Sequence, residues 1–179
     1  METIKQKEKK VFNSLKGKYH YKNTMAAPHL VKIVVATGTG SGIKRDKDRN
    51  TFIMGRLAKI TGQKPATRGA KKSIASFKVR LGDPIGVMVT LRGARMYGFL
   101  EKLVNVAIPR TKDFRGIDRK VVDNIGNLTM SIKEHTIFPE TGDEELKDVF
   151  GMAVTLVTTA KTKEEAIDYF EFLGIPFKK

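Results

Sequence analysis

The sequence predicts an α+β protein: a mainly antiparallel sheet with helices covering one face and the other face left open. Four short segments alternate apolar and polar residues with the two-residue period of a strand that is buried on one side only. Other segments carry apolar residues at helical spacing. No internal repeat or low-complexity linker divides the 179 residues, so we expect a single domain over residues 1–179.

The four predicted strands lie at residues 31–35, 85–91, 128–132 and 152–156. In the first, Val31, Ile33 and Val35 share one face, and Lys32 lies on the other. In the second, Val87, Val89 and Leu91 lie on one face, and the other face carries a polar set that includes Thr90 and Arg92. This polar set is expected on the open face of the sheet.

Helices are expected near residues 5–16, within a basic N-terminal segment 1–20, and near residues 46–60, 96–107 and 162–173. Pro109 ends the third helix, and Gly98 within it costs about 1 kcal/mol relative to alanine. The fourth begins at Thr162 with Glu165 three residues on, the pattern of a capping box, and Gly174 ends it.

Charge is distributed unevenly along the chain. Residues 1–120 hold 28 Lys and Arg against 8 Asp and Glu, whereas residues 121–179 hold 6 against 11. The 34 residues from Arg49 to Gly82 contain nine basic residues and no acid. Ordinary surfaces intersperse both signs, so this stretch favours a polyanion, and nucleic acid first, as the partner.

The segment 66–82 is expected to form a mobile basic loop. Glycine and proline lie at both ends of the run, and few of its residues can be buried. Its cations can meet phosphates, Ser73 can bond backbone oxygens, and the ring of Phe77 can pack on a sugar or base. The loop is therefore predicted to contact nucleic acid.

No catalytic, cofactor or metal site is predicted. The chain has no Cys, and its three His residues lie far apart without a triad or HExxH pattern. The Gly-rich stretch 38–42 lacks the third glycine of a dinucleotide loop and the GK[ST] of a Walker loop, although Lys44 and Arg45 beside it suit phosphate. The acids at 140–148 match no calcium loop and predict a solvated, partner-facing segment.

No apolar run approaches a membrane span, and the N-terminal segment lacks the apolar centre of a signal peptide. We expect a cytoplasmic protein without a membrane partner. A basic amphipathic N-terminal segment could also rest on an anionic membrane, but its few apolar residues make a weak anchor.

Six blocks of sequence resemble one family, the bacterial-type large-subunit ribosomal protein five, in order over about residues 25–177. The blocks are ITGQKP at 60–65, AKKSIASFKVR at 70–80, PIGVMVTLRGARMYGFL at 84–100, IPRTKDFRG at 108–116, SIKEHTIFPE at 131–140 and GMAVTLVTTAKTKEEA at 151–166.

The resemblance implies a structural ribosomal protein that binds 5S rRNA through the open sheet face, seats it in the central protuberance and supports translation. It also implies a basic loop that reaches peptidyl-site tRNA and an intersubunit bridge to a small-subunit head protein. The other partners that it implies are large-subunit rRNA and neighbouring large-subunit proteins. The positions that the resemblance implies for the 5S contact are Gln63, Thr90 and Arg92, and the further predicted rRNA-binding residues are Lys32, Thr37, Lys64 and Arg95. The predicted tRNA-binding residues are Arg68, Lys71, Lys72, Ser73, Phe77, Lys78 and Arg80.

One position departs from the family pattern. The family usually reads VVNMGVG where this chain reads VVATGTG at 34–40, so its RNA-contacting Asn is replaced by Ala36. An alanine side chain has neither the donor nor the acceptor of an amide. Thr37 could compensate, but neighbouring strand residues point to opposite faces.

Two alternatives from other classes stay open at this stage. One is an enzyme that uses the GTGSG stretch to hold a nucleotide; micromolar binding of ATP or NAD without RNA would favour it. The other is a free-standing regulator that binds single-stranded nucleic acid; failure to sediment with large ribosomal subunits would favour that interpretation.

Overall fold

The computed structural model describes residues 2–40, 48–112, 114–142 and 149–178. Over these residues the chain forms a five-stranded sheet and four α-helices, which confirms the α+β class. The strands are β1 (Leu30–Gly38), β2 (Ala66–Gly69), β3 (Pro84–Leu91), β4 (Leu128–Ile132) and β5 (Met152–Thr158). The α-helices are α1 (Ile4–Tyr19), α2 (Arg49–Thr61), α3 (Gly93–Lys102) and α4 (Lys163–Leu173).

The strand order in the sheet is β2-β3-β1-β5-β4. β2 pairs with β3 in antiparallel register. The N–H of Thr39 donates to the carbonyl of Ile85 at 2.9 Å, so the end of β1 lies beside the start of β3. The N–H of Thr159 likewise donates to the carbonyl of His29 at 3.1 Å, next to the start of β1. Neighbouring strands therefore run in opposite directions, as the alternating pattern predicts.

Short helical turns fill the connections. The 3₁₀ turns are η1 (Thr24–Ala26), η3 (Arg119–Val121), η4 (His135–Ile137) and η5 (Pro139–Thr141). α3 continues directly into a π-helical turn, η2 (Leu103–Ala107), in which the N–H of Ile108 donates to the carbonyl of Leu103 at 2.9 Å. The wider turn buries Leu103, Ala107 and Ile108 on one side of the segment.

Internal contacts group the chain into two compact units, although the sequence predicts one domain. Unit 1 comprises Met1–Ile33, Arg92–Met130 and Val154–Lys179, and unit 2 comprises Val34–Leu91 and Ser131–Ala153. The boundaries fall within β1, β4 and β5 and at the end of β3, not in a linker.

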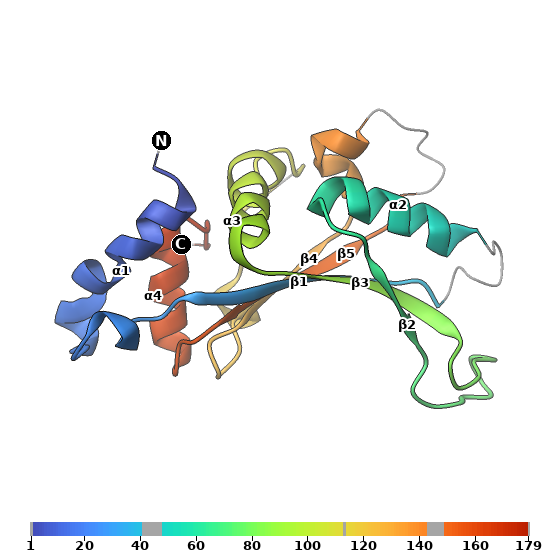
Figure 1. The fold of residues 1–179 in the computed structure, drawn as a ribbon, viewed down its shortest axis with the longest axis horizontal. Helices are drawn as coiled ribbons and strands as arrows, with labels where there is room; N and C mark the ends of the chain where they lie inside the picture. The colour runs from blue at the N-terminus through green and yellow to red at the C-terminus, as the bar shows by residue number, and fades with distance from the viewer. Residues whose placement is uncertain (1, 41–47, 113, 143–148, 179) are drawn as a thin grey trace. The chain divides into compact units, whose positions relative to one another are not determined.

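In unit 1, α1 packs against α4 and α3, as Figure 1 shows for the blue and red helices of this unit. Glu8 of α1 joins these elements: its Oε1 accepts from the N–H of Leu30 at 2.8 Å and from the hydroxyl of Tyr169 at 2.7 Å, and its Oε2 accepts from the hydroxyl of Tyr97. One carboxylate therefore links α1 to β1, α4 and α3.

α4 begins as the sequence predicts. The Thr162 hydroxyl accepts from the N–H of Glu165 at 3.3 Å, which is half of the expected capping box. The Glu165 carboxylate accepts from the N–H of Lys161 at 2.7 Å, one residue before the position that a full box uses. Gly174 ends the helix with φ 100°, as expected of a left-handed cap.

In unit 2, α2 packs on β3. Ile53, Leu57 and Ile60 of the helix are buried, and so are Val87 and Val89 of the strand. The intervening strand residues, Gly86, Met88 and Thr90, remain half-buried. This alternation is the pattern of a strand covered on one face, as predicted.

Candidate nucleic-acid interface

The segment predicted as a mobile loop begins with a strand that the sequence analysis did not foresee. β2 pairs with β3 through Thr67 opposite Val87 and Arg68 opposite Gly86, with a register irregularity between Arg68 and Gly69. All four β2 residues are exposed, so the strand has no apolar alternation from which it could be predicted. In Figure 1 this hairpin continues beyond the paired strands of unit 2 as a projecting loop.

Backbone hydrogen bonds close the loop at its base. Ala70 donates its N–H to the carbonyl of Asp83 at 2.8 Å, and Gly82 donates to the carbonyl of Ala70 at 3.0 Å. A Cβ on Gly69 would lie only 3.0 Å from the carbonyl oxygen of Gly82, so the two arms approach too closely for a larger residue to fit without a shift.

The loop tip forms a second, smaller hairpin. Ile74 and Val79 exchange N–H to carbonyl bonds of 3.0 and 3.2 Å. Lys78 between them has φ 51°, in the left-handed region that tight turns use. The Ser73 hydroxyl accepts from the N–H of Leu81 at 2.9 Å, so this serine orders the loop itself.

Asp83 is a site-positioning residue that the sequence analysis missed. Its Oδ2 accepts from the N–H of Arg80 at 2.7 Å, and its carbonyl closes the base of the loop. It is the first acid after the acid-free stretch and lies between Gly82 and Pro84, and this position in the sequence could have indicated its role.

The hairpin presents its cations to solvent. Among the described residues, none of its five basic side chains pairs with a carboxylate, and Phe77 beside them is 66% exposed. The basic side chains are Arg68, Lys71, Lys72, Lys78 and Arg80, all exposed. Unneutralised cations around an exposed ring suit phosphates and a sugar or base.

Also within unit 2, the structure brings Gln63 and Thr90 together. Gly62, with φ 66°, caps the end of α2 and turns the chain. The Nε2 of Gln63 then donates to the carbonyl of Thr90 at 3.1 Å. The bond orients the Gln63 amide beside the half-buried Thr90, and Lys64 next to it is exposed.

Thr37 does not share the face of the other predicted residues. It is 4% exposed and lies on the covered side of β1, whereas Ala36 is half-buried on the opposite side. Adjacent strand residues point to opposite faces, so the hydroxyl of Thr37 cannot replace an amide at Ala36. The role of Thr37 in rRNA binding stays a prediction, for a residue on the opposite face of β1 from Lys32.

Unit 1 holds the remaining predicted rRNA-binding residues. Lys32 is half-buried in β1. Arg92 is exposed in extended backbone immediately before α3, and Arg95 is exposed in the first turn of that helix. No acid lies in this first turn, so the positive end of the helix dipole adds to the two guanidinium groups.

Several predictions fall wholly or partly outside the described residues. These are the Gly-rich stretch from residue 41 onward, Lys44 and Arg45, the start of the helix predicted at 46, and the acids at 143–148. Within the described ranges, no cluster of three metal-ligating side chains occurs. In the same part of the chain, no helix combines the length and apolar character that a membrane crossing needs.

An antiparallel sheet and a hairpin of exposed cations define an α+β protein suited to a polyanion. Residues 23–80 match the family model of ribosomal protein L5, and residues 84–177 match the model of the C-terminus of the same ribosomal family. The chain is 47% identical over 174 residues to the "Large ribosomal subunit protein uL5" of Thermotoga maritima and to that of Thermotoga sp. (strain RQ2), covering 97% of this chain and 94% of each relative. The chain belongs to the ribosomal protein L5 family.

Family membership confirms the resemblance found in the sequence. The protein is a ribosomal protein of the large subunit, and its partners are rRNA and ribosomal proteins. The family is structural and not enzymatic, which removes the nucleotide-using enzyme as an alternative.

Proposed function

We propose that this large-subunit protein binds 5S rRNA, seats it in the central protuberance of the cytoplasmic ribosome, and contacts peptidyl-site tRNA through the loop 66–82. Among the described residues, the basic side chains of the β2–β3 hairpin are exposed and pair with no carboxylate, and this observation carries the proposal. A hairpin that neutralises none of its own charge gains most from a polyanion.

Residues proposed to contact 5S rRNA occur in each of the two units. Gln63 and Thr90 supply hydrogen-bonding groups in unit 2, where the Gln63 amide is already oriented. Arg92 supplies an exposed guanidinium in unit 1, where the planar fork suits a phosphate or a guanine edge. Lys32 and Arg95 add positive charge in unit 1, and Lys64 adds positive charge in unit 2.

The proposed tRNA contact uses the hairpin tip. Its inner hairpin holds the backbone, so Lys71, Lys72 and Lys78 are presented from a partly ordered scaffold. Phe77 adds an exposed ring that can pack on a sugar or base. The loop therefore combines shape and charge suited to an RNA backbone.

The proposal extends to an intersubunit bridge with a small-subunit head protein. Residues 121–179 carry five more acids than bases, in contrast to the rest of the chain. A basic protein partner complements this third electrostatically, whereas RNA does not.

Separate variants of the two RNA surfaces test the proposal. Arg92→Ala is expected to weaken binding of a 5S rRNA transcript by about 1–3 kcal/mol, because a charge-assisted contact is lost. Lys71→Ala/Lys72→Ala/Lys78→Ala is expected to leave that affinity nearly unchanged and to weaken tRNA retention on reconstituted ribosomes. Filter binding measures the first affinity, and Arg110→Ala is the control for loss of one exposed arginine outside the proposed surface.

The opposite pattern would contradict the assignment of surfaces. If the triple loop variant abolished 5S binding while Arg92→Ala behaved like Arg110→Ala, the hairpin would be the 5S site.

A further inference from the structure

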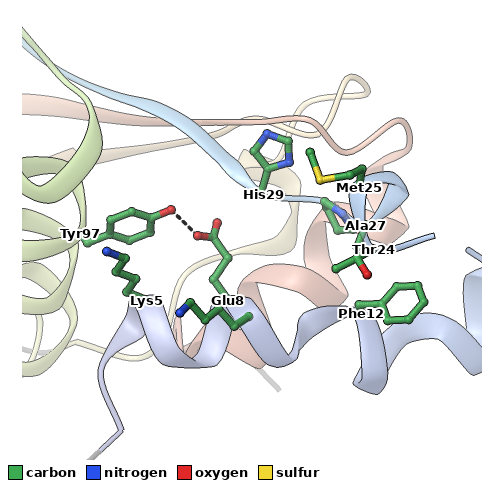
Figure 2. Close-up of a pocket in the computed structure, with 10 residues that line it drawn as sticks. Lys5, Glu8, Phe12, Thr24, Met25, Ala27, His29 and Tyr97 are labelled. Atoms are coloured by element: carbon green, nitrogen blue, oxygen red, sulfur yellow. Dashed lines mark hydrogen bonds between the residues drawn. The ribbon is translucent and has the colours of Figure 1, made fainter.

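Unit 1 contains a pocket of about 300 Å³ that belongs to neither proposed RNA surface. Figure 2 shows its lining. α1 contributes Lys5, Glu8, Lys9 and Phe12, the η1 turn contributes Met25, and Tyr97 comes from α3. The pocket thus has cations at its rim, apolar side chains in its wall and one carboxylate among its polar groups.

The rim cations are part of a stripe along α1. Lys5, Lys9, Phe12 and Lys16 are spaced by four, three and four residues, so they lie on one face of the helix. The ammonium group of Lys16 lies 5.2 Å from the centre of the Phe12 ring. Lys5 and Lys9 are exposed, and neither pairs with a carboxylate in the described part of the chain.

Other lysines of the same helix are neutralised. Lys10 pairs with Glu2, and Lys18 pairs with Asp168 of α4. Lys7 donates to the carbonyl of Leu173 at 3.2 Å. Lys5 and Lys9 line the pocket and pair with no carboxylate among the described residues, so they would attract a ligand with negative groups.

The pocket wall includes an unusual apolar exposure. Met25 is 84% exposed at the centre of the η1 turn, and Phe12 of α1 is half-buried; both line the pocket (Figure 2). A thioether and an aromatic ring make favourable contacts with the flat face of another ring. A planar ligand in the pocket would therefore gain from contact with either side chain.

Glu8 also lines the pocket and is held by three hydrogen bonds. Its Oε1 accepts two hydrogen bonds, whereas its Oε2 accepts one, from Tyr97, and retains room for another donor. Burial, and then the bond to Glu8, raise the pKa of the Tyr97 phenol, so this partner stays a neutral donor. The pocket offers an acceptor to a ligand edge that carries N–H groups.

We propose that this pocket holds one unstacked base of a single-stranded RNA segment, with its amino edge toward Oε2 of Glu8 and the flanking phosphates on Lys5 and Lys9. A nucleotide in a strand combines a flat face, an N–H edge and adjacent negative charge, which are the three features that the pocket complements. An acidic peptide would place its carboxylates against Glu8, and a basic peptide would be repelled by the lysines.

The test uses the full chain labelled with ¹³C at its methionine methyl groups, and Met25→Leu assigns the Met25 signal. The probes are single-stranded octamers of cytidine and of uridine, which carry equal charge. We expect the cytidine octamer to shift the Met25 methyl signal and to bind at least threefold more tightly than the uridine octamer, since cytosine presents an amino donor that a carboxylate accepts.

Neighbouring lysines of α1 give a matched pair of variants. Lys9→Ala is expected to weaken binding of the cytidine octamer about fivefold at 0.1 M salt, from a slope of roughly 0.7 per phosphate contact on single strands. Lys10→Ala removes the same charge from the next position of the helix and is expected to change the affinity less than twofold.

Several outcomes would overturn the inference. An unmoved Met25 signal, or equal effects of Lys9→Ala and Lys10→Ala, would mean only diffuse electrostatic attraction to α1. Binding of free cytidine monophosphate as tight as that of the octamer would identify a nucleotide site. Displacement of the Met25 shift by polyglutamate at equal charge would identify an acidic protein as the occupant.

Discussion

His135 is a buried histidine whose surroundings favour the neutral ring. It is 4% exposed and stacks on Phe150 with 4.2 Å between ring centres and an interplanar angle of 8°. The N–H of Phe150 donates to its Nδ1 at 3.4 Å. Burial, and then the charge of Arg56, lower the pKa of His135 below 6.5, whereas the backbone hydrogen bond with Phe150 and the charge of Glu134 act in the opposite sense and are outweighed.

This environment predicts a pH-dependent stability. The unfolded chain takes up a proton near pH 6.5, whereas the folded protein does so only at lower pH, so the unfolding free energy should fall as pH decreases below 6.5. His135→Phe is expected to remove this part of the pH dependence. Urea titrations between pH 7 and pH 5 measure it, with His20→Asn as the exposed-histidine control.

A profile of His135→Phe that is parallel to the wild type over this range would show that another group is responsible.

Individual residues of the site could be predicted from sequence only where their role is local. The cations of the hairpin were predicted from composition alone, and they are exposed. The contact between Gln63 and Thr90 depends on the left-handed turn at Gly62, which no periodicity reveals. Glu8 was missed, although it is the only acid in the lysine-rich α1, and that isolation was the available signal.

The β2–β3 hairpin determines how its loop can be both ordered and accessible. Hydrogen bonds hold the loop at its base and again at Ile74 and Val79, while the side chains between these points face solvent. Hydrogen bonds therefore hold the loop at its base and at the Ile74–Val79 pair, and not along its whole length. The prediction that residues 66–82 are mobile needs this refinement before it is tested.

Amide hydrogen exchange of the free protein should show an alternating pattern across the loop. The N–H groups of Ala70, Ile74 and Gly82 are hydrogen-bonded and should exchange more slowly than those of Lys71 and Lys72. A hydrogen-bonded amide exchanges only after its bond opens, whereas an exposed amide without such a bond exchanges directly. We expect Lys71 and Lys72 to gain protection when peptidyl-site tRNA is bound to the ribosome, since new phosphate contacts order the backbone.

Uniform strong protection from 70 to 82 in the free protein would indicate a rigid element and contradict the expected mobility. Exchange unchanged by tRNA would weaken the proposed contact.

Elements were predictable where one face is buried and the other is not. Four strands and four helices lie where the apolar period predicts them, with ends shifted by a few residues. β2 has no buried residue, so its pairing with β3 left no pattern to detect. The π-helical turn after α3 was missed because its extra residue disturbs the helical spacing only locally.

At the scale of the whole molecule, charge is separated along the chain. The net charge of +15 comes entirely from residues 1–120, since residues 121–179 are net acidic. Association with RNA should therefore release counterions from many phosphates at once.

This predicts a steep salt dependence of binding to 5S rRNA. A plot of log affinity against log salt concentration should fall with a slope of a few units, at roughly 0.7–0.9 per phosphate contact. Filter binding between 50 and 300 mM KCl measures the slope, and Lys120→Ala, at an exposed position outside the proposed surfaces, is the control. A slope near zero would mean that electrostatics is not the main source of affinity.

The hairpin also matters before the protein reaches a ribosome. β2 is an edge strand of the sheet, and an edge with unpaired N–H and carbonyl groups invites another chain to add to it. β2 is only four residues long, carries Arg68 and has an irregular register at Gly69. These are features by which natural sheets resist edge-to-edge aggregation. The charge suited to phosphate thus also protects newly made, unassembled copies from one another.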